Sequence, residues 1–150
     1  MLKAGDTLPD LTLKNTEGQA LRLHDFLGQY LVIYFYPKDN TPGCTMEACE
    51  FRDNYDDFEK EDARVFGISG DSVASHQKFA AKLNLNFDLL SDPKRQAEKA
   101  FGVPRNLFGL LPGRVTFVFN RDGKLLETIN SATNPRLHQK QALKTIQAQS

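Results

Sequence analysis

The stretch "YLVIYFYPKDNTPGCTMEACE", Tyr30 to Glu50, contains a strand, a turn and the start of a helix. Its first seven residues are all apolar or aromatic, which is typical of a central strand covered on both faces in an α/β protein. Pro37 ends this run. Thr41 is a favourable N-cap and Pro42 a favourable first helical residue, so the sequence predicts a helix from Thr41 to about Phe58.

Strand and helix patterns alternate along the rest of the chain. Apolar residues alternate on both sides of Thr16-Glu17-Gly18, which predicts an N-terminal β-hairpin. Further strands are predicted at 63–69, 87–92 and on both sides of a turn at 121–123, and further helices at 71–85, 92–103 (opening with Asp92 as cap and Pro93) and 134–149. The order predicts an α/β fold, a mixed central sheet flanked by helices, in one domain of residues 1–150.

Composition excludes several classes of partner. Lys plus Arg equals Asp plus Glu at 19 each, so net charge gives no reason to expect nucleic acid or an anionic membrane surface. No apolar run approaches the ~20 residues of a membrane-spanning helix, and the start "MLKAGDTLPD" lacks the apolar core of a signal peptide. A soluble, cytoplasmic protein is therefore expected.

Metal and dinucleotide sites are not predicted. Two cysteines cannot fill a tetrahedral zinc site, and His24, His76 and His138 are scattered without ligand spacing. The turn after the first buried strand lacks a glycine fingerprint for a dinucleotide. We expect no metal and no cofactor.

Cys44 has the position of a reactive thiol. A free thiol has a pKa of roughly 8.5, and it must become a thiolate to act as a nucleophile. Cys44 falls in the first turn of the predicted helix, where unpaired N–H groups and the helix dipole favour an anion. The dipole supplies ~0.3–2 kcal/mol, so a further cation is expected. The alternative is that Cys44 is a small buried apolar residue, but its place beyond the carboxyl end of a buried strand favours chemistry.

The pattern Pro37-x-x-x-Thr41-x-x-Cys44 resembles the signature of the peroxiredoxins, which are thiol peroxidases with a thioredoxin-like fold. The longer stretch to Asp53 is similar to the bacterioferritin comigratory protein, or Q-type, branch. The resemblance continues through "VFGISGDS", "FDLLSDP", "AFGV" and "GRVTFVFNRDGK". It implies a thioredoxin-like fold and reduction of hydrogen peroxide and organic hydroperoxides, in antioxidant defence.

The resemblance also implies roles for individual residues. Cys44 would attack the O–O bond and become a sulfenic acid. Thr41 would hydrogen-bond the peroxide or the thiolate, and Pro37 would shield the sulfenic acid. Arg114 would supply the missing cation and stabilise charge as the O–O bond breaks. The backbone N–H groups of Gly43 and Cys44 would donate to the peroxide.

Cys49 would be the resolving cysteine, forming a disulfide with Cys44 that thioredoxin reduces; glutaredoxin stays open as an alternative reductant. Five residues on a regular helix put two Cα atoms about 8.7 Å apart, whereas a disulfide needs about 4.4–6.8 Å. We therefore expect the helix to unwind during catalysis. Glu47 has two interpretations: a partner that orients Arg114, or a solvated surface charge.

Two other classes of protein also use a close pair of cysteines. A thioredoxin-type oxidoreductase is disfavoured, because it would carry C-x-x-C rather than four intervening residues. A redox sensor that uses the same cysteine pair stays open. The apolar stretch Phe108 to Gly113, just before Arg114, is interpreted as a wall or lid of the site or a contact patch. The resemblance implies a monomer, since no long arm follows the last helix.

Overall fold

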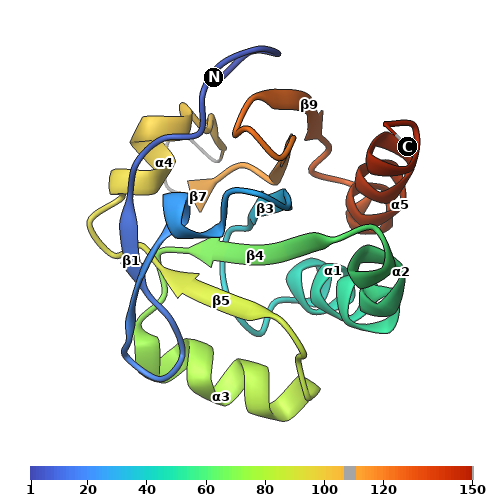
Figure 1. The fold of residues 1–150 in the computed structure, drawn as a ribbon. Helices are drawn as coiled ribbons and strands as arrows, with labels where there is room; N and C mark the ends of the chain where they lie inside the picture. Colours follow the sequence, from blue (N-terminus) through green and yellow to red (C-terminus); the bar gives the residue numbers. More distant parts are fainter. Residues whose placement is uncertain (107–110, 150) are drawn as a thin grey trace.

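The computed structural model describes residues 1–106 and 111–149, and it is built around a seven-stranded sheet with the order β2-β1-β5-β4-β3-β8-β9 (Figure 1). The strands are β1 (Thr12–Lys14), β2 (Ala20–Arg22), β3 (Tyr30–Phe35), β4 (Ala63–Ser69), β5 (Asp88–Ser91), β8 (Val115–Phe119) and β9 (Leu125–Asn130). Strands β3, β4 and β5 are parallel to one another, and the other pairings are antiparallel. The predicted mixed sheet, its central strand and its two hairpins are confirmed.

Five α-helices and one short 3₁₀ helix accompany the sheet in the described chain. They are η1 (Leu23–Phe26), α1 (Pro42–Asp53), α2 (Tyr55–Lys60), α3 (Val73–Leu83), α4 (Gln96–Phe101) and α5 (Pro135–Gln147). A separate two-stranded pair, β6 (Arg105–Asn106) with β7 (Leu111–Pro112), was not predicted from the sequence.

The central strand β3 separates two apolar cores. Leu31, Ile33 and Phe35 belong to the core that α4 and η1 cover. Val32 and Tyr34 point to the opposite face, where they pack with residues of α1, α2, α3 and α5. Because both faces of β3 are buried, its run of seven apolar residues has no polar alternation. Figure 1 shows α1, α2 and α5 standing together, away from α4.

Two predicted helix boundaries were wrong. The helix expected from Thr41 to Phe58 ends at Asp53, and α2 starts after Asn54. Asn54 interrupts it: its backbone leaves the helical region at φ −112° and ψ 11°, and its side-chain amide donates to the Glu50 carbonyl at 2.8 Å.

The fourth helix begins at Gln96 rather than directly after Asp92 and Pro93. Arg95 adopts a left-handed conformation with φ 59°, so no helix can run through it. Asp92 still caps the helix from a distance, because its carboxylate accepts hydrogen bonds from the N–H groups of Ala97 (3.1 Å) and Glu98 (3.0 Å).

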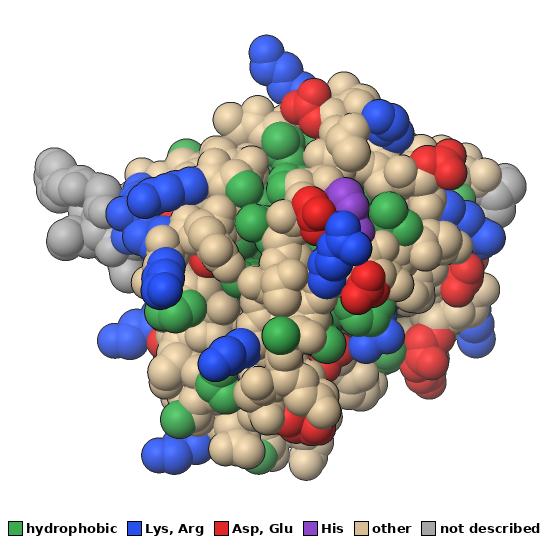
Figure 2. Space-filling model, turned by 60° about the vertical axis from the view of Figure 1, so that its left-hand side comes forward, with side chains coloured by type: hydrophobic (Ala, Val, Ile, Leu, Met, Phe, Trp, Pro, Cys, Tyr) green, Lys and Arg blue, Asp and Glu red, His purple; other side chains and the backbone are tan. Residues whose placement is uncertain are grey.

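The surface agrees with the balanced charge of the sequence. On the face drawn in Figure 2, acidic and basic side chains both occur and are interspersed with uncharged ones. Within residues 1–106 and 111–149, every helix is too short or too polar to cross a membrane.

Candidate active site

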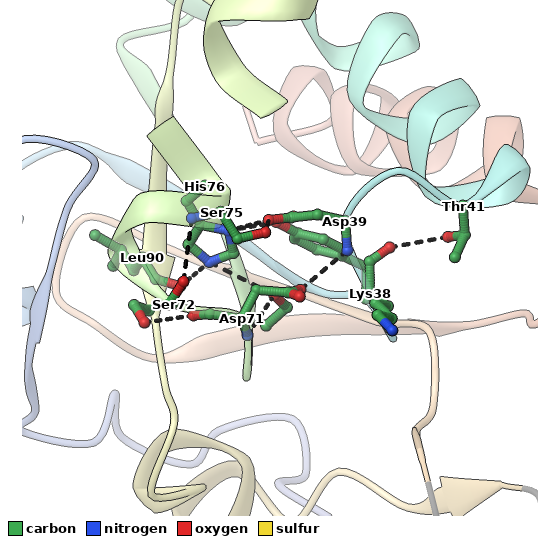
Figure 3. Close-up of polar contacts among 11 residues, drawn as sticks. Lys38, Asp39, Thr41, Asp71, Ser72, Ser75, His76 and Leu90 are labelled. Atoms are coloured by element: carbon green, nitrogen blue, oxygen red, sulfur yellow. Dashed lines mark hydrogen bonds and ion pairs between the residues drawn. The ribbon is translucent and has the colours of Figure 1, made fainter. Parts of the chain in front are cut away.

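The turn before α1 leaves two backbone donors open. Thr41 is the N-cap in an extended conformation, and its carbonyl accepts the first helical bond, from the Thr45 N–H at 2.9 Å. Its hydroxyl donates to the Lys38 carbonyl at 2.9 Å and caps no N–H group (Figure 3). Gly43 and Cys44 are the second and third residues of α1, so their N–H groups have no acceptor within the helix. These two donors can bind an oxygen atom of a ligand.

Arg114 lies beside Cys44 although 69 residues separate them in the sequence. Strand β8 pairs with β3, and this pairing brings its first residue opposite the last residue of β3. Arg114 directly precedes β8 and therefore reaches the start of α1. Its Nη2 donates to the Cys44 Sγ at 3.4 Å, and the two side chains are buried. A guanidinium at this distance stabilises a thiolate, as the sequence argument required.

Gly43 allows this close approach. A Cβ atom on residue 43 would lie 2.9 Å from the Arg114 Nη2 and 3.7 Å from the Pro135 ring. Real Cβ atoms do not approach other atoms this closely, so any side chain here would push the guanidinium away from its place. The glycine therefore serves the site through its small size as well as through its N–H group.

Glu47 is fully buried and accepts a hydrogen bond from the Arg114 Nη1 at 2.7 Å. The interpretation of Glu47 as a solvated surface charge is thus wrong. Burial raises the pKa of Glu47 to about 8, even though Arg114 stabilises its ionised form. One guanidinium thus contacts both Glu47 and Cys44.

His138 and Thr116 extend this buried network and were missed from the sequence. The Nδ1 atom of His138 lies 2.8 Å from the Thr116 hydroxyl and 3.6 Å from the Glu47 Oε2, and its Nε2 lies 2.8 Å from the Ser131 carbonyl. Burial lowers the pKa of His138 to about 4, so the ring is neutral, with its proton on Nε2. The sequence does carry a signal for the burial of His138, because it shares the buried face of α5 with the residues four and eight positions later.

The comparison with known families identifies the chain. Residues 4–128 match the sequence model of the AhpC/TSA family, which is most of the chain. The chain belongs to this family, the peroxiredoxins. Among curated relatives, peroxiredoxin Q (chloroplastic) of Sedum lineare is 48% identical over 144 residues, which are 96% of this chain and 77% of that protein. A putative peroxiredoxin Q (chloroplastic) of Oryza sativa subsp. indica is 46% identical, over 96% of this chain and 66% of its own length.

Solved peroxiredoxins share the fold. Peroxidoxin BcpB from Mycobacterium tuberculosis superposes with a TM-score of 0.92 at 40% identity, over 99% of this chain and 98% of its own. The bacterioferritin comigratory protein of Xanthomonas campestris superposes with a TM-score of 0.86 at 33% identity, over 96% and 99%. The predicted thioredoxin-like fold and Q-type branch are confirmed, and this peroxiredoxin is a thiol peroxidase.

Cys49, Pro37 and the apolar stretch before Arg114 are the other parts of the predicted site. Cys49 is half-buried on α1, the same helix as Cys44, and both thiols are free. Pro37 is half-buried after β3 and lines a hollow of about 250 Å³ whose lining includes Arg95 and Arg105 but not Cys44. Residues 108–110, half of the apolar stretch before Arg114, lie outside the described residues, and Leu111–Pro112 form β7.

The buried Glu47 carboxyl makes the stability of this peroxiredoxin depend on pH. Its folded pKa of about 8 lies above the ordinary 4.5, so the native state holds a proton that the unfolded chain releases. This contribution is complete below pH 4.5 and is lost as the pH rises through about 8. In a Cys44→Ser background, we expect the free energy of unfolding to fall by about 1 kcal/mol between about pH 7 and about pH 8.5.

Urea unfolding at several pH values measures this effect. The additional Glu47→Gln substitution should remove the fall, while Glu50→Gln, on the same helix but partly exposed, should leave it in place. An equal fall in the Glu47→Gln protein would show that another group is responsible.

Proposed function

We propose that this peroxiredoxin reduces hydrogen peroxide and organic hydroperoxides to water and alcohols through a Cys44 sulfenic acid, which Cys49 resolves as an intramolecular disulfide. The observation that carries the proposal is the Arg114 Nη2, 3.4 Å from the Cys44 Sγ, at a helix start with two open N–H donors. The crystallised Xanthomonas campestris relative is described by its alkyl peroxide reduction activity, which supports organic hydroperoxides as substrates.

The first step is a two-electron transfer from sulfur. The Cys44 thiolate attacks one peroxide oxygen, an S–O bond forms and the O–O bond breaks. The leaving hydroxide or alkoxide takes up a proton and departs as water or alcohol. Arg114 and the N–H groups of Gly43 and Cys44 stabilise the negative charge that develops on the peroxide oxygens. The Thr41 hydroxyl donates its proton to the Lys38 carbonyl, so it can offer the peroxide only the lone pairs of its oxygen. Pro37 shields the sulfenic acid from water.

The second step joins the two cysteines. The Cys49 sulfur attacks the Cys44 sulfenic sulfur, an S–S bond forms and water leaves. Both residues lie within the regular helix α1, where five residues of separation exceed the reach of a disulfide. The first turns of α1 therefore unwind before this step and rewind after reduction.

The setting of the enzyme completes the proposal. Thioredoxin reduces the disulfide, with glutaredoxin as the alternative. The enzyme acts as a monomer of one domain, residues 1–150, because a disulfide within one helix needs no second chain. It works in the cytoplasm, a reducing compartment in which both cysteines can return to thiols between turnovers. The term chloroplastic belongs to the names of the plant relatives.

Peroxide consumption tests the function. Reduced protein is mixed with excess hydrogen peroxide or cumene hydroperoxide and with thioredoxin, thioredoxin reductase and NADPH, and in parallel with a glutaredoxin system. Many turnovers per chain support the peroxidase and identify its reductant. Oxidation that stops after one equivalent of peroxide with both reductants would favour the redox sensor instead.

A further inference from the structure

A second buried polar cluster lies at the carboxyl ends of the parallel strands β3, β4 and β5, beside the loop that leads to α1 (Figure 3). We call it the Asp39 cluster. Its members are Tyr36, Asp39, Ser69, Asp71, Ser75 and His76. The steps proposed above use none of these side chains.

Asp39 is buried, although it belongs to the short loop between β3 and α1. Its Oδ1 accepts a hydrogen bond from the Tyr36 hydroxyl at 2.6 Å. Its Oδ2 accepts one from the Ser75 hydroxyl at 2.8 Å and lies 2.7 Å from the Nδ1 of His76. Burial opposes ionisation of this carboxyl, but the hydrogen bond and charge of His76 hold the pKa of Asp39 below its ordinary value. Asp39 is therefore a carboxylate.

Both ring nitrogens of His76 face acceptors. Nδ1 faces the Asp39 carboxylate, and Nε2 lies 3.1 Å from the Leu90 carbonyl, which can only accept. The two nearby hydroxyls donate their hydrogen bonds to other groups: Tyr36 donates to Asp39, and Ser69 donates to Asp71 at 2.6 Å. The Nδ1 of His76 therefore carries a proton that it donates to the Asp39 carboxylate, and His76 forms a fully buried pair with Asp39.

The pair holds the loop that precedes the reactive cysteine. The backbone N–H of Asp39 donates to the Asp71 Oδ2 at 2.9 Å, so the loop is fixed by its main chain as well as by its side chain. The carbonyl of Lys38 accepts the Thr41 hydroxyl, and Thr41 caps α1. Contacts thus run from His76 through Asp39 to the first turn of α1, which contains Cys44.

We propose that His76 is a positioning residue for the peroxide-reducing step: it holds Asp39 and thereby fixes residues 37–41 and the open N–H groups of the first turn of α1. This inference rests on the proposed function. The reaction with peroxide requires the first turn of α1 to be placed correctly within a fraction of an ångström. Reduction of the disulfide, in contrast, occurs with this turn unwound. Loss of the contact between His76 and Asp39 should therefore slow the first step alone.

A cation site is the other interpretation of this cluster. One ligand atom each of Asp39, Asp71 and His76 lies within 4.8 Å of the others. The cluster is explained without an ion, because these three residues already contact hydrogen-bond partners through the Oδ2 of Asp39, the Oδ2 of Asp71 and the Nδ1 of His76.

Kinetics of a His76→Asn variant test the proposal. We expect kcat/KM for peroxide to fall about 10- to 100-fold, because the loop is misplaced, while kcat/KM for the reductant stays unchanged. Asp39→Asn should have the same effect. The double variant should be no slower than either single variant, because both substitutions break the same contact, that between His76 and Asp39. His24→Asn is the matched control, since it also removes a ring contact to a backbone carbonyl (Leu8, 2.8 Å), on η1.

Nuclear magnetic resonance of the wild-type protein, labelled with ¹⁵N-histidine, gives a readout that does not depend on any variant. The Nδ1 of His76 should carry a proton that is hydrogen-bonded to Asp39. An Nδ1 atom without a proton, or a folded His76→Asn protein with wild-type kcat/KM for peroxide, would overturn the proposal. Equal loss in both kinetic constants would indicate a merely structural role. Wild-type protein without peroxide turnover would instead refute the proposed function, so the two failures are distinguishable.

Discussion

Replacing Cys44 by serine is expected to reduce peroxide consumption to the uncatalysed background. The hydroxyl of serine is far less acidic than a thiol, so the adjacent Arg114, 3.4 Å from the sulfur, cannot turn it into an anion. Stopped-flow measurement of peroxide loss, with thioredoxin present and absent, gives the rate.

Cys49→Ser is the matched control, because it removes a thiol from the same helix and leaves Cys44 in place. It should consume one equivalent of peroxide per chain and then stop, since no second thiol resolves the sulfenic acid. Peroxide turnover that survives in the Cys44→Ser protein would assign the chemistry to another group.

Arg114→Gln is expected to lower kcat/KM for peroxide by about 10²–10³-fold, the usual effect of removing a donor that stabilises transition-state charge. The substitution removes the only cation for which a contact with the Cys44 sulfur is seen in the described chain. Arg114→Lys should recover part of the rate, because it keeps the charge but cannot contact Cys44 and Glu47 at once as the two Nη atoms do.

Two further proteins make this measurement decisive. Arg136→Gln is the control, since Arg136 is an exposed arginine on α5 that pairs with Glu50 at 3.3 Å. Loss of Arg114 leaves the buried Glu47 without this partner, which can destabilise the fold. The double variant Arg114→Gln/Glu47→Gln removes the buried carboxyl as well, so its rate separates the loss of the cation from a folding defect. Wild-type kcat/KM in a folded Arg114→Gln protein would exclude the proposed role of Arg114.

Local signals explain why the start of the site could be predicted from the sequence. The run Tyr30–Tyr36 has no polar interruption because both faces of β3 are covered, and such a pattern is visible in any sequence. Pro42 restricts its own backbone angles and those of the preceding Thr41, so the start of α1 was predicted to the residue. Helix ends that depend on a side chain bonding a nearby carbonyl, as at Asn54, were not predictable in this way.

Long-range contacts explain what the sequence alone could not provide. The position of Arg114 depends on the pairing of β3 with β8, and only the resemblance to peroxiredoxins pointed to this arginine. From the sequence, His76 and His138 are considered only as metal ligands, although the helical spacing around His138 indicates a buried face. Their places in two buried hydrogen-bond networks follow from the packing of α3 and α5 against the sheet.

Oxidation of the reduced protein by one equivalent of hydrogen peroxide tests most directly that Cys44 and Cys49 act together on a helix that must unwind. Peptide mapping without reductant identifies the bond, and hydrogen exchange of the α1 amides measures the unwinding. We predict one disulfide between Cys44 and Cys49 within each chain, together with loss of protection in the first turns of α1 and its return after reduction. A disulfide between two chains, or an internal disulfide with α1 fully protected, would contradict this mechanism.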